Sequence, residues 1–286
     1  MAIVEEQMNM FHRSDRLTER DLRHEMSIMA YPFCQLSNRT GRADTITYND
    51  GNVALTVSAG KHGLPDLQDF DLILYLVTVV NKLRDNGIQV TANDWIEIDP
   101  HEFLSAAQWH RGGKYYSRLK AAIRRLSTTH IQTNIFAEDL ETETGAALIT
   151  EYKMQTRTDS AGRKAVVALR LKISEWLWHA VIMRENVTRV SQRVFEFDNP
   201  TAKKIYMIVS RHMYQSDQFE IGLAKLKARC GIDGKNALFK QRLQRLVESG
   251  KLPDFLVEFK QSRHDRRALV VVFRRRQAVG IGSRAG

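Results

Sequence analysis

The chain has 286 residues, of which 43% are hydrophobic and 27% are charged, and its formal net charge is +10. This excess of positive charge favours a polyanionic partner, which means DNA, RNA or an anionic membrane surface. The most apolar run, Leu72–Val80, is far shorter than the roughly 20 residues that a membrane-spanning helix needs. The N-terminus has early acids and no apolar core of a signal peptide. We therefore predict a cytoplasmic protein with no membrane partner.

The cysteines and histidines show no ligand pattern. Cys34 and Cys230 form no CxxC pair, and none of the nine histidines has the spacing of a metal ligand. We predict a reduced protein with no disulfide framework, no metal site and no cofactor.

The first half of the chain contains both helical and strand periods. Residues 1–30 are polar and weakly periodic, which predicts a flexible N-terminal arm with a short helix near Thr18–Met29. Residues 31–51 are rich in turn residues. Asp66 is expected to cap a helix that ends at Asn86–Gly87. The other expected helices are 100–109, 113–127 and 174–185, and the expected strands are 52–60, 95–99, 130–136, 146–154 and 165–173.

The same order of elements recurs after Asn199–Pro200, which marks the start of a helix. A short strand, a short helix, a second basic helix and a hairpin follow it. Gly231 and Gly250 are expected to end the two later helices. The expected elements are helices 201–214, 223–231 and 234–250, and strands 218–222, 254–261 and 268–276.

One supersecondary unit is therefore expected twice: a helix, a short strand, two helices and a hairpin. The apolar triplets of the two long basic helices share one spacing, and they are Leu119, Ile123 and Leu126, then Phe239, Leu243 and Leu246. This order predicts an α+β chain of tandem winged-helix domains, in which a β-hairpin wing follows a helix-turn-helix. The expected parts are the arm (1–30), a first domain with its linker helix (31–183), a second domain (184–276) and a C-terminal tail (277–286).

The first basic helix is a candidate for the major groove of DNA. An ordinary solvated helix face carries acids for i,i+4 pairs, but none occurs between Gly112 and Thr133. The apolar triplet places Arg118 and Arg125 on the outer side, and Arg118 is the first candidate for a base contact. The candidate DNA-binding residues are Lys114, Tyr115, Ser117, Arg118, Lys120, Ala121, Arg124 and Arg125.

The second basic helix and the two hairpins complete the expected interface. Arg245 is the candidate base reader there, and Glu248 dilutes the positive field. The further candidates are Lys235, Asn236, Lys240, Gln241 and Gln244, with Arg263, Arg266 and Arg267 in the second hairpin. The hairpin expected around residues 137–145 is acidic, with Glu138, Asp139, Glu141 and Glu143, so we expect it to point away from DNA or to contact another protein subunit.

Catalytic patterns are weak in this sequence. There is no phosphate-binding GxxxxGK[ST] loop and no His-x-His pair that would accompany a nucleophilic Tyr115 or Tyr116. We predict that the chain is not an enzyme and has no catalytic residues. A nicking or strand-transfer enzyme remains an alternative, which would cleave supercoiled DNA with a divalent metal.

Several stretches resemble the replication initiator protein A family of bacterial plasmids. They are "EMSIMAYPFCQLS", "DLQDFDLILYLVTVV", "GGKYYSRLKAAIRRLSTTHIQTNI", "ISEWLWHAVI" and "LPDFLVEF", and they span most of residues 25–260. The resemblance implies a sequence-specific binder of double-stranded DNA that recognises the repeats of its plasmid origin. It also implies recruitment of the host initiator and the replicative helicase, and repression of its own gene as a homodimer. A copy-control repressor without an initiator role is the alternative.

Overall fold

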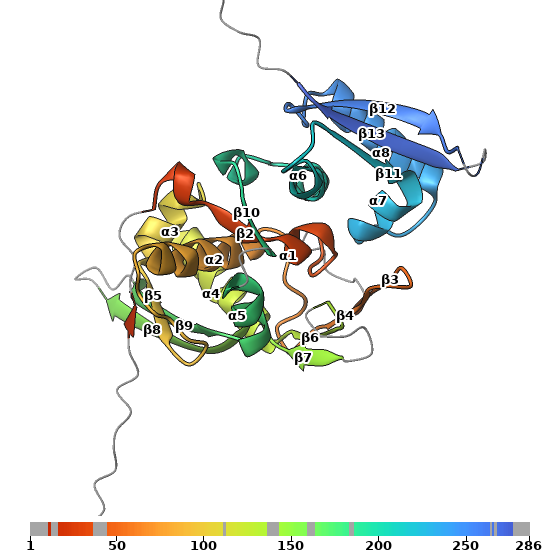
Figure 1. Cartoon of the computed structure of the whole chain (residues 1–286). Coiled ribbons are helices and arrows are strands. Elements are labelled where there is room, and N and C mark those ends of the chain that lie inside the picture. The colour runs from red at the N-terminus through yellow and green to blue at the C-terminus, as the bar shows by residue number, and fades with distance from the viewer. Residues whose placement is uncertain are drawn as a thin grey trace, which may run out of the picture.

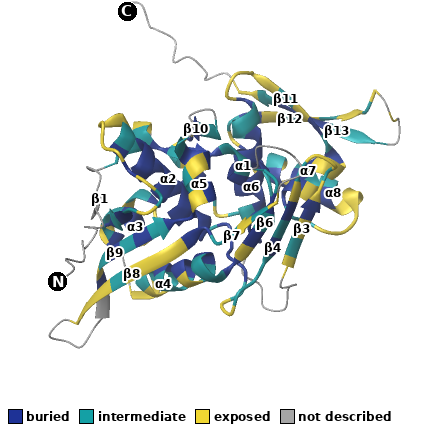
Figure 2. Cartoon of the chain, turned by 60° about the horizontal axis from the view of Figure 1, so that its bottom comes forward, coloured by how far each residue is buried: buried dark blue, intermediate teal, exposed yellow. Residues whose placement is uncertain are grey.

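The computed structural model describes residues 11–12, 17–36, 45–110, 113–135, 143–158, 164–182, 186–263, 265 and 268–276. The buried side chains form two hydrophobic clusters, one drawn mainly from residues 22–195 and the other from residues 202–273. Figure 2 colours in dark blue the parts of the ribbon whose residues are buried. Helix α6 (Pro200–His212) contributes to both, because Met207 lies in the first cluster and Ile205 in the second. The expected division into domains at residues 183 and 184 stays a prediction.

The segment before residue 31 is built into the core. A 3-10 helix (Glu19–Asp21), strand β2 (Arg23–Glu25) and helix α1 (Met26–Ala30) replace the single helix that the sequence suggested. His24, Glu25 and Met29 are fully buried, and β2 pairs with β10 (Val187–Arg189), far along the chain. The expectation of a flexible arm is therefore wrong for residues 22–30. Tertiary pairing with β10, which local periodicity does not report, fixes this segment.

Helix α2 (Phe70–Asp85) is the centre of the first half. Nearly all its side chains are buried, and it begins at Phe70, three residues later than expected. Around it lie helices α3 (Pro100–Ala106), α4 (Gly113–Thr128) and α5 (Glu175–Ile182) (Figure 1). Asp99 caps α3 as its side chain accepts the backbone N–H groups of His101 and Glu102, and Pro100 follows it at the first position.

Two sheets complete the first half. One has the order β1-β5-β9-β8 and the other the order β3-β4-β6-β7. The strands of the first sheet are β1 (Phe11–His12), β5 (Trp95–Ile98), β9 (Lys164–Ile173) and β8 (Ile149–Thr158). Those of the second are β3 (Thr45–Asn49), β4 (Ala54–Ser58), β6 (His130–Thr133) and β7 (Thr144–Ala146).

Two strand predictions need correction here. Residues 45–49 were expected as turn, but they form β3 and pair with β4 because Ile46 and Tyr48 pack inward. The single returning strand expected at residues 146–154 is divided. Its first residue ends β7, which pairs with β6, and most of the rest belongs to β8, which pairs with β9.

The second half follows the expected order closely. Asn199 caps α6 by accepting the N–H of Ala202, and Gly231 and Gly250 take the left-handed conformation after the later helices, as expected from glycine at those positions. The elements after α6 are β11 (Gln218–Gly222), α7 (Leu223–Arg229), α8 (Asn236–Glu248), β12 (Phe255–Gln261) and β13 (Leu269–Arg275). A 3-10 helix (Gln192–Phe195) precedes α6.

The two halves share one arrangement. The sheet order β11-β13-β12 of the second half repeats the order β5-β9-β8 of the first, and all these pairs are antiparallel. The hairpin that corresponds to β12–β13 is therefore β8–β9, and β6–β7 is an insertion between α4 and this hairpin. The expectation that the acidic segment 137–145 joins the corresponding hairpin is wrong. Its residues Glu138, Asp139 and Glu141 lie outside the described residues.

Helix α6 joins the halves through two adjacent lysines. Lys203 Nζ donates to Asp71 Oδ1 at 2.5 Å, and both side chains are buried. Lys204 Nζ donates to the carbonyl oxygens of Ile28, Met29 and Tyr31 at 2.6–3.1 Å, at the C-terminal end of α1. Burial lowers the pKa of Lys204 to about 8. The ammonium is stabilised there because a helix C-terminus carries partial negative charge.

Candidate nucleic-acid interface

Helices α4 and α8 have the same buried face. Leu119, Ile123 and Leu126 of α4 are each at most 1% exposed, and Phe239, Leu243 and Leu246 of α8 are also buried. The helical register that the sequence predicted is therefore confirmed. Position n of α4 corresponds to position n + 120 of α8 when these triplets are aligned. The outward faces of the two helices can thus be compared residue by residue.

The outward face of α4 carries basic side chains together with small ones. Lys114, Ser117 and Arg124 are exposed, and Lys120 and Ala121 are half-buried. No acid of the described residues forms an ion pair with Lys114, Lys120 or Arg124. Tyr115 is half-buried and packs against the core, with its ring against His110 at 5.4 Å between centroids. Three cations thus stand on or beside the exposed face of α4, and no carboxylate among the described residues neutralises them.

Arg118 and Arg125 do not lie on that outward face, contrary to the placement predicted from the apolar triplet. Arg118 Nη2 donates to both oxygens of Asp66 at 3.1 and 3.3 Å, and its guanidinium lies 5.3 Å from the ring centroid of Trp109. Arg125 makes a bidentate pair with Asp69 at 2.7 and 2.8 Å. We call this side of α4 the paired flank. A helical wheel cannot show it because each acid precedes its arginine partner by more than 50 residues in the chain.

The ion pair between Arg125 and Asp69 in the paired flank is largely buried. The Asp69 side chain is 0% exposed and that of Arg125 is 12% exposed. Hydrogen bonding to Asp69 raises the pKa of Arg125, so the guanidinium stays charged. Burial raises the pKa of Asp69, and the bond to Arg125 opposes that rise. The bidentate geometry favours the ionised carboxylate, because both oxygens accept hydrogen bonds from one guanidinium.

The short segment that contains Asp66 and Asp69 also contacts the second half of the chain. Asp71 lies two residues after Asp69 and accepts hydrogen bonds from Lys203 of α6 and from Trp109 Nε1, the latter at 3.1 Å. Burial raises the pKa of Asp71, and the charge of Lys203 opposes this shift. Residues 66–71 therefore bind α4 on one side and α6 on the other. A cavity of about 370 Å³ is lined by Asp66, Asp71, Arg118 and Lys203 at this junction.

The outward face of α8 has a different composition. Lys235, Asn236, Gln241 and Arg245 are exposed as expected, whereas Lys240 and Gln244 are half-buried. Lys240 lies over the ring of Phe259 at 5.6 Å, so β12 covers that side of the helix. The large exposed side chains of α8 that the sequence analysis missed are Leu238 and Arg242. Their spacing from Arg245, seven and three residues before it, was the signal that could have found them.

The hairpins supply further surface. In the second hairpin Arg263 is exposed, and the predicted residues Arg266 and Arg267 lie outside the described residues. In the first, Lys153 and Arg157 of β8 are exposed. Lys153 and Lys172 lie over the buried ring of Trp95 at 4.4 and 4.9 Å. The β8–β9 hairpin is thus basic where the sequence analysis expected an acidic one.

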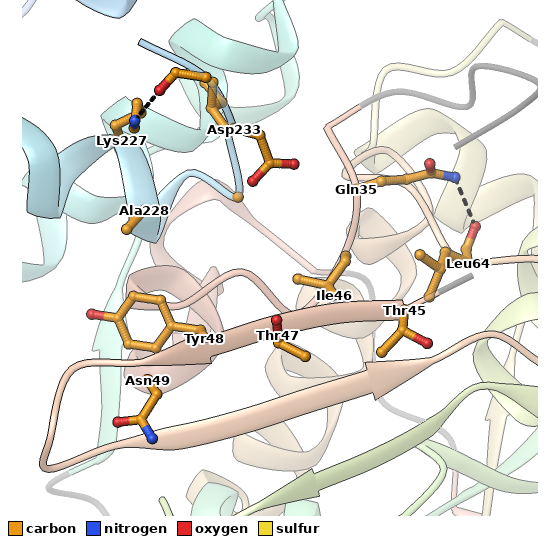
Figure 3. A pocket seen from close by; sticks show the side chains of 13 residues that line it. Gln35, Thr45, Ile46, Thr47, Tyr48, Asn49, Leu64, Lys227, Ala228 and Asp233 are labelled. Carbon is orange, nitrogen blue, oxygen red and sulfur yellow. Dashed lines mark hydrogen bonds between the residues drawn. The ribbon is translucent and has the colours of Figure 1, made fainter. Parts of the chain in front are cut away.

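A separate cavity of about 450 Å³ lies between β3 and the turn that follows α7 (Figure 3). Thr45, Tyr48 and Asn49 line one side, and Lys227 and Asp233 line the other. Lys227 Nζ donates to the carbonyl oxygen of Gly234, which holds this turn just before α8. None of the predicted DNA-binding residues lines this cavity.

No described helix combines the length and the apolar character that crossing a membrane requires. Within the same residues, no group of three or more His, Cys, Asp or Glu side chains could hold a metal ion.

Comparison with known proteins shows which family the chain belongs to. The profile of the family described as replication initiator protein A matches residues 23–257, which is most of the chain. The chain therefore belongs to the replication initiator protein A family, as the resemblance predicted.

A curated relative and two solved structures are similar to this chain. A protein of Wigglesworthia glossinidia brevipalpis named "Putative replication protein" is 24% identical over 251 residues, which cover 87% of this chain and 89% of that protein. Crystal structures of domains 2 and 3 of RctB are similar in fold. One has a TM-score of 0.59 at 11% identity, covering 87% of this chain and 97% of that one. Another has a TM-score of 0.55 at 11% identity, covering 85% and 95%.

Proposed function

We propose that the chain is a replication initiator that binds specific double-stranded DNA at the origin of its plasmid through two winged-helix modules. In this proposal the first module is α2, β5, α3, α4 and the β8–β9 hairpin. The second is α6, β11, α7, α8 and the β12–β13 hairpin. Helices α4 and α8 take the place of the recognition helix, which lies in the major groove in helix-turn-helix proteins.

One observation carries the proposal. A chain of this family holds the same unit twice, and the third helix of each unit turns to solvent an exposed face whose cations form no ion pair with a described acid. Such faces attract the phosphate backbone, and Gln, Asn and Arg side chains can read base edges. Lys114, Lys120, Arg124 and Arg263 are assigned to phosphates, and Gln241 and Arg245 to bases.

The finer role is part of the same proposal. The chain would bind direct repeats at the origin, recruit the host initiator and replicative helicase, and repress its own gene, with a homodimer as the repressing state. Membership of the replication initiator protein A family supports a role in replication. The function is proposed to need no cofactor and no catalytic residue of this chain.

The test is a footprint of the purified protein on the DNA that flanks its gene, at low and at physiological salt. The expected result is protection of several evenly spaced direct repeats that persists at physiological salt. With six to ten phosphates neutralised, the logarithm of affinity should fall with the logarithm of salt concentration with a slope of about −0.9 per contact. Protection of one inverted repeat would indicate a repressor, and diffuse protection that vanishes with salt would refute specific binding.

A further inference from the structure

Leu238 is the most exposed of the large hydrophobic side chains in the described part of the chain. It lies in the first turn of α8 and is 64% exposed. It is not among the partly buried residues that pack against the second hydrophobic cluster. Single apolar residues on a surface are common, so exposure alone shows little. Its place on the helix decides what it means.

Leu238 lies within a row of polar side chains that can read bases. Gln241, Arg242 and Arg245 follow it at i+3, i+4 and i+7, which puts all four on one side of α8. Each is exposed. The equivalent position in α4 is Arg118, where Asp66 and Trp109 cover the side chain. In α8 the same side is uncovered, so Leu238 can meet whatever lies against the helix.

The chemistry of the major groove limits what a leucine can recognise there. Base edges in this groove offer hydrogen-bond donors and acceptors, and one apolar group, the C5-methyl of thymine. A leucine can neither donate nor accept a hydrogen bond. Its apolar surface gains free energy only when it leaves water against another apolar group. A thymine methyl is therefore the base feature that fits Leu238.

We propose that Leu238 contacts the C5-methyl of one thymine in the recognised site and thereby sets a preference for thymine at that position. Gln241, Arg242 and Arg245 would hold the helix in register beside it. This inference rests on the proposed function and adds to it a residue, a base and the chemical group that is read.

The test replaces each thymine of the footprinted site, one at a time, with deoxyuridine. Uracil keeps the O4 acceptor and the pairing with adenine but lacks the methyl group. Losing one buried methyl is expected to weaken binding by the wild-type chain about four-fold. The Leu238→Ala variant should bind the thymine site about that much more weakly and be indifferent to uracil at the one sensitive position.

Two variants serve as controls. Leu238→Met keeps an apolar side chain of similar reach and should retain the uracil effect. Leu256→Ala removes a leucine that is 50% exposed on β12, and it should leave the uracil effect unchanged. Because Leu238 is exposed, its alanine variant should keep the thermal midpoint of the wild type, which circular dichroism can check.

The outcomes separate this inference from the proposed function. A uracil penalty at one thymine that disappears in Leu238→Ala supports the contact. Specific binding in which no thymine is sensitive, or in which Leu238→Ala keeps every penalty, overturns the contact and leaves the proposed function standing. If the chain protects no DNA specifically, both fall.

Discussion

Helices α4 and α8 occupy equivalent places in the two halves, but acids cover one flank of α4 and leave that flank of α8 open. Asp66 and Asp69, just before α2, bind Arg118 and Arg125 of α4. In the second half Asp198, just before α6, binds Lys251 beyond the end of α8. The residues of α8 that correspond to Arg118 and Arg125 are Leu238 and Arg245, and both are exposed.

The two helices share a shape, but they differ in whether buried acids already bind their arginines. Both helices have the spacing and the positive charge of a DNA-binding helix, but an arginine held by a buried carboxylate must break that pair before it binds a base. We therefore propose that α8 supplies the base contacts. In α4, Lys114, Lys120 and Arg124 would hold phosphates, while Arg118 and Arg125 position the helix.

The largest expected effect concerns the paired flank. Arg125→Ala would leave the fully buried Asp69 carboxylate without its partner, which should lower the free energy of unfolding by about 3–5 kcal/mol. Urea denaturation would measure this. The matched control is Arg245→Ala at the equivalent exposed position, where a change within about 0.5 kcal/mol is expected. Equal losses in the two variants would show that the flanks do not differ.

The next effect concerns the open flank. Arg242→Ala should weaken specific DNA binding by about 1–3 kcal/mol with little loss of stability, because Arg242 is exposed beside the candidate base readers. Lys240→Ala is the control, since Lys240 lies over Phe259 and away from the open side. Titration of labelled origin DNA would measure both. A larger binding loss for Lys240→Ala would place the DNA on the other side of α8.

A smaller effect is expected on the outward face of α4. Arg124→Ala should reduce the steepness of the salt dependence of binding by about one phosphate contact, with the same change on all DNA sequences. Lys251→Ala also removes a cation, but one already paired with Asp198, and should leave the salt dependence unchanged. If Arg124→Ala instead alters the choice of sequence, α4 reads bases after all.

The smallest effect concerns pH at the junction of the halves. Burial, with nearby Lys204 and Lys203, lowers the pKa of His24 to about 3 from its usual 6.5. Between these values the unfolded chain binds more protons, so this histidine makes stability fall as pH falls. The raised pKa of Glu25, about 7, acts in the opposite direction between pH 4.5 and 7. His24→Gln should therefore be compared with the wild type by denaturation across this range. A variant with an identical pH profile would exclude the histidine effect.

Local patterns in the sequence predicted where the helices lie better than they predicted which distant residues contact them. The triplets of α4 and α8 were recognisable because apolar spacing reports the buried face of a helix, and Asn199–Pro200 marked the start of α6 for a local reason. Strand β3 and the division between β7 and β8 depend on which distant strands pair. Arg118 and Arg125 pair with acids over 50 residues away, and these pairs could not be predicted from the sequence for the same reason.

The exposed side of α8 was also displaced from its expected place. A wheel drawn from Phe239, Leu243 and Leu246 makes Gln244 look as exposed as Arg245, puts Lys240 at the edge of the outer face, and places Arg242 near the core. The β12–β13 hairpin then covers one side, which shifts the open face toward Leu238 and Arg242. Such cover is a tertiary effect, and helical periodicity alone cannot indicate it.

The most direct test compares Arg118→Ala and Arg245→Ala for affinity to the footprinted origin site and to unrelated DNA, together with their thermal midpoints. We expect Arg245→Ala to lose about tenfold or more in selectivity at an unchanged midpoint, and Arg118→Ala to keep selectivity at a lower midpoint. If Arg118→Ala loses selectivity and Arg245→Ala does not, the assignment of base reading to the open flank of α8 is wrong.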